Sequence, residues 1–133
     1  MVRRQVAETS TQVLYWDDEL RIVWGELRDA VHDEAAAAAN IDAQEKIRDE
    51  IGVRKTRAVI DMRRVRAISR EAREYYANER TASIQRATAL LVGSKLTKVI
   101  ANFFMGLNKP VSPTRMFTNP DEALAWLATF PDE

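Results

Sequence analysis

The sequence predicts an α/β domain whose sheet is mostly parallel and begins with an antiparallel hairpin. Residues 58–60 and 87–92 form apolar runs without polar alternation, which is typical of parallel strands covered on both faces. Each run precedes a helix start, the first at Ser69 and the second at Gly93-Ser94. Strands that alternate with helices in this way indicate parallel neighbours joined by right-handed crossovers.

Length and composition are compatible with one domain over residues 1–133 that buries a sizeable core. The absence of cysteine excludes disulfides and thiolate chemistry and fits a reducing compartment. Twenty basic residues balance twenty acidic ones, so the overall charge does not indicate a nucleic-acid partner. There is no signal-peptide pattern, and the longest apolar stretch, residues 35–39, is too short to span a membrane. We therefore expect a cytoplasmic protein without integral membrane association.

The N-terminal hairpin is predicted from two clusters of β-branched and aromatic residues, 13–16 and 20–24, with Val6 marking a further strand before them. The polar residues 17–19 between the clusters are interpreted as a solvated turn rather than as a metal site. Alternation in the second cluster predicts a strand with one buried side, because Arg21 falls on the face opposite to its apolar neighbours. Those neighbours are Leu20, Ile22 and Trp24.

A long helix is predicted from His32 or Asp33 to Ile51, since acidic residues fit its first turn and Gly52 is a natural stop. Its apolar face is expected at Ala36, Ala39, Ala43, Ile47 and Ile51. His32 is the only histidine, and at a helix start we expect it to cap or to be exposed rather than to serve in catalysis or metal binding.

A second helix is predicted to begin at Ser69, whose hydroxyl can accept hydrogen bonds from free amides of the first turn. A strand over residues 56–62 precedes this helix and the strand over residues 87–92 follows it. The inner side of the helix is expected at Ala72, Tyr75, Tyr76 and either Ala82 or Ile84.

The helix that follows Ser94 has the clearest amphipathic pattern of the chain. Its inner face is expected at Leu96, Val99, Ile100, Phe103, Phe104 and Leu107. Residues 108–110 end it, residues 114–117 form a short strand, and Asn119 caps a last helix that Pro131 stops. The predicted order is three strands and a helix, followed by three strand–helix pairs, which gives about four helices.

Ligands of open parallel sheets approach the carboxyl ends of the strands. The chain delivers Asp61 and Arg63 to one such end and Ser94 and Lys95 to the next. The turn at Gly93 could hold an anion on free helix amides, helped by Lys95 or Arg63, although good capping explains the same residues. The glycine spacing of a phosphate-binding loop is absent.

The segment over residues 102–110 places glycine and asparagine within a bulky apolar turn. One interpretation is that Phe103, Phe104 and Leu107 pack against the sheet. The other is that part of this face, with Met105, stays exposed as a homodimer surface or as the mouth of a pocket for an apolar ligand.

Residues 59–65 (Val-Ile-Asp-Met-Arg-Arg-Val) and 68–72 (Ile-Ser-Arg-Glu-Ala) resemble the STAS fold of anti-sigma-factor antagonists. The tail, including Asn108-Lys109-Pro110 and residues 113–117 and 122–127, is similar to small uncharacterised bacterial proteins grouped as STAS/SEC14-like. The resemblance implies a STAS-like sheet and a role in protein interaction.

In the antagonists, the loop after this strand carries Asp-Ser-Ser-Gly, and a partner kinase phosphorylates its first serine. Alignment on Ile68 puts Ser69 at the aspartate position and Arg70 at the phosphoacceptor position. The resemblance therefore implies that the phosphoswitch is lost here. Only a shift of one residue would bring Ser69 into that role.

Three functional hypotheses follow. The leading one is a non-catalytic STAS-like interaction or regulatory module, homodimeric, that contacts a protein partner through strand-end loops and exposed parts of the Ser69 or Phe103 helices. The alternative is a binder of a small apolar or anionic ligand in the manner that the SEC14 resemblance implies. The third is an enzyme built around Asp61, Lys95 and Arg115, for which no nucleophile–base pair can be assembled. The candidate binding residues are Asp61, Arg63, Ser69, Arg70, Ser94, Lys95, Phe103, Phe104, Met105, Lys109 and Arg115. We expect no catalytic residue, metal or cofactor.

Overall fold

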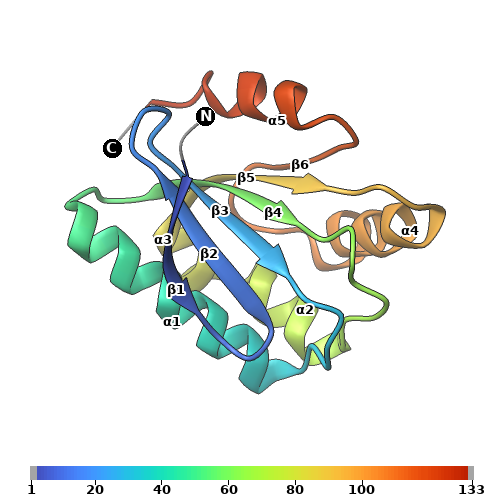
Figure 1. Ribbon diagram of the computed structural model, residues 1–133. Helices are drawn as coiled ribbons and strands as arrows, with labels where there is room; N and C mark the ends of the chain where they lie inside the picture. Colours follow the sequence, from blue (N-terminus) through green and yellow to red (C-terminus); the bar gives the residue numbers. More distant parts are fainter. Residues whose placement is uncertain (1–2, 132–133) are drawn as a thin grey trace.

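The computed structural model describes residues 3–131 and contains a six-stranded sheet with helices on both faces (Figure 1). The strands are β1 (Arg3–Glu8), β2 (Gln12–Asp17), β3 (Ile22–Leu27), β4 (Thr56–Asp61), β5 (Gln85–Leu91) and β6 (Thr114–Phe117). The helices are α1 (Glu34–Ile51), α2 (Arg70–Ala77), α3 (Glu79–Ile84), α4 (Lys95–Phe103) and α5 (Pro120–Leu127), with a π-helical turn, η1 (Phe104–Asn108), directly after α4.

The strands lie in the sheet in chain order. The first three pair antiparallel, and β3 to β6 pair parallel, which confirms the predicted fold class. Each parallel connection moves one place in the same direction, so right-handed crossovers put the connecting helices α1 to α4 on one face. Figure 1 shows α5 alone on the other face.

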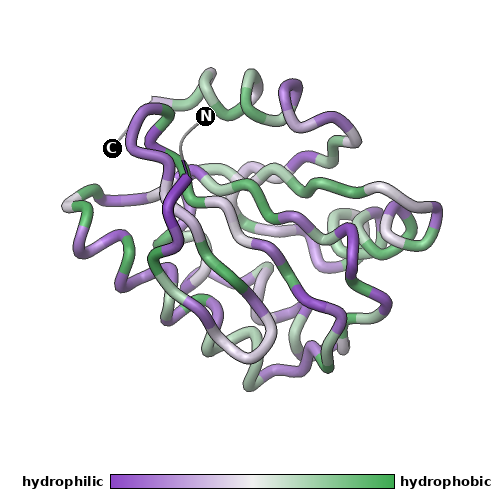
Figure 2. The backbone as a smooth tube through the Cα atoms, viewed as in Figure 1, coloured by the Kyte–Doolittle hydropathy of each residue, from purple (hydrophilic) through white to green (hydrophobic). Residues whose placement is uncertain are grey.

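The sheet is hydrophobic on both faces, and Figure 2 shows green segments along its central strands. On the α5 face, the core contains Ile22, Trp24, Val59, Leu91, Phe117 and Leu127. On the opposite face there are two clusters. One lies against α1 and contains Leu14, Trp16, Val23, Ile47 and Ala58. The other lies against α4 and contains Leu27, Met62, Val65, Leu90, Val92 and Ala101.

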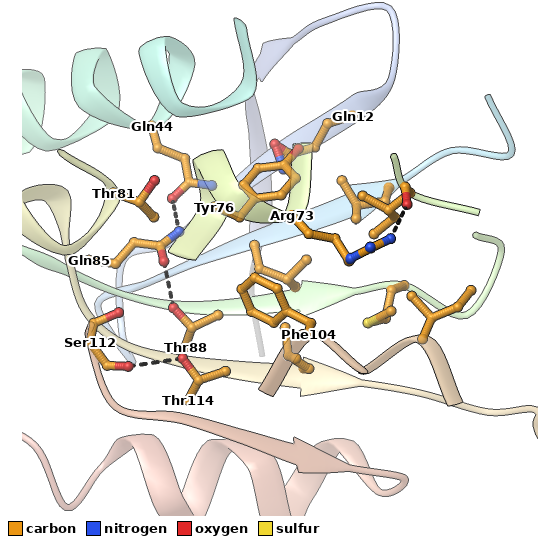
Figure 3. Close-up of a pocket in the computed structure, with 16 residues that line it drawn as sticks. Gln12, Gln44, Arg73, Tyr76, Thr81, Gln85, Thr88, Phe104, Ser112 and Thr114 are labelled. Carbon is orange, nitrogen blue, oxygen red and sulfur yellow. Dashed lines mark hydrogen bonds between the residues drawn. The ribbon is translucent and has the colours of Figure 1, made fainter. Parts of the chain in front are cut away.

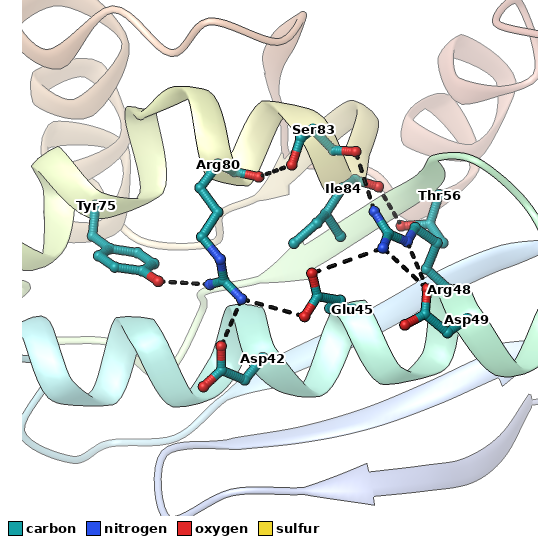
Figure 4. Close-up of polar contacts among 9 residues, drawn as sticks. All are labelled: Asp42, Glu45, Arg48, Asp49, Thr56, Tyr75, Arg80, Ser83 and Ile84. Carbon is teal, nitrogen blue, oxygen red and sulfur yellow. Dashed lines mark hydrogen bonds and ion pairs between the residues drawn. The ribbon is translucent and has the colours of Figure 1, made fainter.

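Two arginines connect α1 to α2 and α3 (Figure 4). Arg80 donates to the Tyr75 hydroxyl at 2.6 Å and to an Asp42 carboxylate oxygen at 2.7 Å. Arg48 contacts Asp49 on its own helix and the Ser83 carbonyl oxygen at 3.4 Å. These contacts hold α1 beside α2 and α3 on the same face of the sheet.

The predicted faces of β3 and α1 were wrong. β3 is buried on both sides, because α5 covers one face while α1 covers the other, and Leu20 lies in the turn before the strand. α1 buries Ala37, Asn40, Ile41, Gln44 and Ile47, so only Ile47 of the five expected positions is fully buried. The inward face is rotated relative to the alanine pattern and includes two polar side chains.

His32 is only 3 % exposed, and Asp33 rather than His32 caps α1. The His32 Nε2 lies 2.7 Å from the Arg28 carbonyl oxygen. The expectation of a capping or exposed histidine was therefore wrong. Asp17, expected in a solvated turn, is also buried, and its Oδ1 accepts from the backbone N–H groups of Glu19 and Leu20.

The helix predicted from Ser69 is divided at Asn78, which ends α2 and caps α3 through a hydrogen bond from the Thr81 backbone N–H. The helix after Ser94 forms as predicted, but four of its six expected inner residues are exposed. They are Leu96 (48 %), Val99 (49 %), Phe103 (52 %) and Leu107 (67 %). Ile100 and Phe104 do pack against the core. The apolar positions extend around more of the helix than the sheet can cover.

Among residues 3–131, no helix combines the length and apolar character that crossing a bilayer requires. Within the same residues there is no group of three or more His, Cys, Asp or Glu side chains placed to hold a metal ion.

Candidate functional site

The carboxyl end of β4 is closed by an ion pair. Asp61 accepts from the backbone N–H of Arg63 at 3.1 Å and from its guanidinium at 2.9 and 2.8 Å. The hydrogen bonds to Asp61 raise the pKa of Arg63. The Arg63 stem also packs over Gly93, with Cγ 3.2 Å from where a Cβ of residue 93 would stand. Both carboxylate oxygens of Asp61 therefore accept hydrogen bonds from Arg63.

The turn at the carboxyl end of β5 satisfies its own amides. Thr97 Oγ1 accepts from the backbone N–H groups of Gly93 and Ser94 at 3.1 and 3.0 Å, and Ser94 Oγ accepts from the Thr97 N–H at 3.1 Å. This is a complete capping box. An anion would have to displace Thr97 to reach these donors, so the capping interpretation accounts for the residues better than an anion site does.

Ser69 and Arg70 also have structural partners. Ser69 Oγ accepts from the Ala72 backbone N–H at 3.1 Å, which makes Ser69 the cap of α2, as predicted. Arg70 is exposed and pairs with Glu74 one turn along the same helix. Such a pair on a helix surface stabilises it only slightly.

Asp61, Lys95 and Arg115 are not joined by any hydrogen bond or ion pair of the described residues. Lys95 is exposed in the first turn of α4. The Arg115 guanidinium lies over the Phe117 ring, 5.2 Å from its centroid. Lys109, at the end of η1, is exposed and has a left-handed backbone, with φ of 50°.

A small cavity lies between the sheet and the layer formed by α1 to α4 (Figure 3). It encloses about 50 Å³, enough for a few waters or a small organic group. Its apolar wall includes Leu27, Ile60, Met62, Leu90, Ile100 and Phe104. Its polar wall includes Gln12, Gln44, Tyr76, Thr81, Gln85 and Thr88.

Two of the three glutamines in this wall have a hydrogen-bonded side-chain oxygen. Gln85 Nε2 donates to Gln44 Oε1 at 2.7 Å, and Thr88 Oγ1 donates to Gln85 Oε1 at 2.6 Å. All three side chains are buried. Gln12 is equally buried, at 1 % exposure, but its Oε1 has no partner. Within the described part of the chain, no hydrogen bond involves the Gln12 side chain.

Tyr76 and Arg73 bring further polar groups to the cavity from α2. Burial raises the pKa of Tyr76 to about 12, opposed by a hydrogen bond from Asn40, so the phenol stays protonated at neutral pH. Its oxygen accepts from Asn40 Nδ2 at 2.9 Å. Arg73 donates to the Ile68 carbonyl oxygen and to Asn108 Oδ1, which connects α2 to η1. No ion pair among residues 3–131 includes Arg73.

Of the candidate residues predicted from sequence, Phe104 alone lines this cavity. Met105 packs against the core cluster beside α4 but does not line the cavity. Phe103 is exposed to solvent. The other wall residues were missed. The sequence feature that could have indicated them is a polar side chain at a core position, such as Gln44 between Ile41 and Ile47 on one face of α1.

A second candidate site is the outer face of α4 and η1, here called the α4 surface. It consists of Leu96, Val99, Phe103 and Leu107 with the neighbouring Lys95, Lys98 and Lys109. Leu96, Val99 and Phe103 are three or four positions apart in α4, so they form one stripe along the helix, and Leu107 follows in η1. At the α-helical rise per residue, the part of the stripe from Leu96 to Phe103 is about 10 Å long.

The mixed sheet, its antiparallel N-terminal strands and its helical layers define an α/β domain of the SpoIIAA-like, or STAS-like, class, as predicted. The chain belongs to the family described as Domain of unknown function (DUF7793), whose model matches residues 26–131. No match is found among curated proteins.

Two solved structures are similar to this chain. One is an uncharacterised protein of the DUF3478 family with a SpoIIAA-like fold from Shewanella loihica PV-4. It has a TM-score of 0.55 and 13 % identity, and the match covers 95 % of this chain and 92 % of that one. The other is a protein with unknown function from Arthrobacter sp. FB24, with a TM-score of 0.30 and 28 % identity, where the match covers 86 % and 97 %. At 13 % identity, the first likeness shows the fold alone.

Proposed function

We propose that this chain is a non-catalytic protein-interaction module and that its α4 surface binds an acidic, amphipathic helix of a partner protein. The observation that carries the proposal is the exposed stripe of Leu96, Val99, Phe103 and Leu107. Contiguous apolar side chains left in solvent are uncommon on isolated domains and mark interaction sites. Spacing of three and four residues is the pattern by which one helix packs against another.

The charge around the stripe supports an acidic partner. Residues 93–109 contain Lys95, Lys98 and Lys109 and no aspartate or glutamate. Complementary charges at the rim of an interface increase the association rate and exclude wrong partners. A second copy of the chain fits this surface less well, because a two-fold contact would bring the lysines of both copies into one interface. Homodimerisation itself stays a prediction.

The test uses two synthetic helical peptides of about four turns, roughly 15 residues, that share a leucine stripe. One carries glutamates beside the stripe and the other carries lysines. Fluorescence anisotropy of labelled peptides should show binding of the acidic peptide only. Lys98→Glu and Phe103→Ser should each weaken that binding at least tenfold. Val31→Ser is the control, because Val31 is an exposed apolar residue that lies outside α4 and η1.

Three outcomes would overturn the proposal: equal binding of both peptides, equal binding by the Val31→Ser and Phe103→Ser proteins, or no binding of either peptide. Two further measurements address other occupants. Co-sedimentation with phosphatidylserine vesicles that Phe103→Ser abolishes would assign the surface to a membrane instead. A dimer in sedimentation equilibrium that Phe103→Ser dissociates would assign it to a second copy.

A further inference from the structure

The cavity over β4 and β5 is lined by the buried amide of Gln12, whose Oε1 has no hydrogen-bond partner. Gln44, Gln85 and Thr88 form a continuous chain of hydrogen bonds (Figure 3). Gln12 is buried to the same degree and makes no side-chain hydrogen bond within the described residues. Because an unpaired buried amide destabilises a fold, its position here indicates an unfilled site.

The backbone makes room for Gln12. Gly25, on the neighbouring strand, has no side chain, and the Gln12 Nε2 lies 2.8 Å from where a Cβ would be. Gly25 is not in a left-handed conformation, since Gly52 is the one glycine of the described residues with positive φ. The glycine is therefore explained by the close approach of Gln12 and not by the backbone geometry of a turn.

A second group of the cavity has unused hydrogen-bonding capacity. The Tyr76 hydroxyl accepts from Asn40, and no hydrogen bond of residues 3–131 uses its proton. Asn40 also donates to the hydroxyl of Thr11, the residue before Gln12. The Asn40 side chain therefore contacts both Tyr76 and the residue next to Gln12. The hydroxyl can donate and the Gln12 carbonyl can accept. The wall opposite these polar groups is aliphatic and aromatic, with Ile60, Leu90 and Phe104.

From this arrangement we propose that the cavity binds a small neutral molecule with one amide or hydroxyl group and a short apolar body. The polar group donates to Gln12 Oε1 and accepts from the Tyr76 hydroxyl, while the apolar body contacts Ile60, Leu90 and Phe104. A neutral ligand is favoured because uncharged groups dominate the wall and its one cation, Arg73, is held by Ile68 and Asn108. This inference goes beyond the proposed interaction role and does not depend on it.

The test compares propionamide with propionate, which has the same shape and a negative charge. Titrations followed by ¹⁵N chemical shifts should show saturable, millimolar binding of propionamide, with the largest shifts at Ile60 and Leu90. Propionate should bind at least tenfold more weakly. Gln12→Leu and Tyr76→Phe should each weaken propionamide binding at least tenfold, whereas Gln5→Leu, the same change at an exposed position of β1, should leave it unchanged.

The proposal is overturned if neither probe gives saturable shifts, or if both variants bind propionamide as the unchanged protein does. Tighter binding of propionate, with shifts at Arg73, would also overturn it by showing an anion site. If Gln12→Leu fails to give a native spectrum, Tyr76→Phe alone decides. Failure of this test leaves the peptide-binding test of the α4 surface unaffected, because that test measures a different face.

Discussion

The side chain of Gln12 occupies the space above Gly25, with Nε2 2.8 Å and Cδ 3.2 Å from the point where a Cβ of residue 25 would stand. The two residues lie on the paired strands β2 and β3. This contact places an amide in the cavity that the sheet shares with α1 to α4. It also makes the size of residue 25 and the orientation of Gln12 depend on each other.

Gly25→Ala should lower the free energy of unfolding by about 1–3 kcal/mol, because the new methyl group crowds Gln12 and Ile60. In a Gln12→Ala background the same change should cost less, since the crowded side chain is gone. Urea unfolding of the four proteins measures this coupling. Gly106→Ala is the control, because nothing lies within 4 Å of its added Cβ. Equal costs in both backgrounds would contradict the contact.

Gln12→Leu and Gln44→Leu should change stability in opposite directions, although both glutamines are buried. Gln12→Leu replaces an unpaired amide and should raise the free energy of unfolding by about 1–2 kcal/mol. Gln44→Leu removes the acceptor of Gln85 Nε2 and should lower it by about 1–3 kcal/mol. Thermal unfolding of the two variants tests this. A loss of stability in Gln12→Leu would show that its amide has a partner in the native protein.

Phe103 and Phe104 are adjacent in sequence but differ in environment. Phe103→Ala should change the free energy of unfolding by less than about 1 kcal/mol, because the ring is half exposed and outside the core clusters. Phe104→Ala should cost about 2–3 kcal/mol, because this ring packs against the α4 cluster and lines the cavity. Chemical denaturation measures the free energy of unfolding of both variants. An equal loss in the two would show that the Phe103 ring is buried in solution.

Stability should fall in the alkaline range through Tyr76. Burial raises the pKa of Tyr76 from 10.0 to about 12, so the unfolded chain loses this proton at a lower pH than the folded one. The stabilisation is complete below pH 10 and is lost as the pH rises toward 12, by roughly 2–3 kcal/mol in all. Tyr76→Phe should remove this part of the pH dependence and Tyr75→Phe should not. The same alkaline loss in Tyr76→Phe would contradict the assignment.

The order of strands and helices could be predicted because each element is marked by residues that are neighbours in the sequence. The unbroken apolar runs in β4 and β5 indicate strands buried on both faces. Ser69, Ser94 and Asn119 each cap the helix that was expected to follow them. The division at Asn78 was missed, since the inner face of one continuous helix was expected to extend to Ala82 or Ile84.

The helix faces were harder to predict because periodicity does not say how much of a helix the neighbouring layer covers. In α4 the apolar positions surround more than one face, so Leu96 and Phe103 stay in solvent while Ile100 does not. The cavity could not be predicted because its wall comes from distant parts of the chain. Gln12 and Gln85 line the same cavity although two strands lie between β2 and β5 in the sheet.

The most direct test of the interaction role is to map where the acidic peptide binds, by ¹⁵N chemical shifts of the full chain. The perturbed amides should lie within residues 95–109, on α4 and η1, and Lys98→Glu should remove these shifts. Shifts centred on the edge strand β1 or on the loop after β4, with residues 95–109 unchanged, would contradict the assignment of the α4 surface.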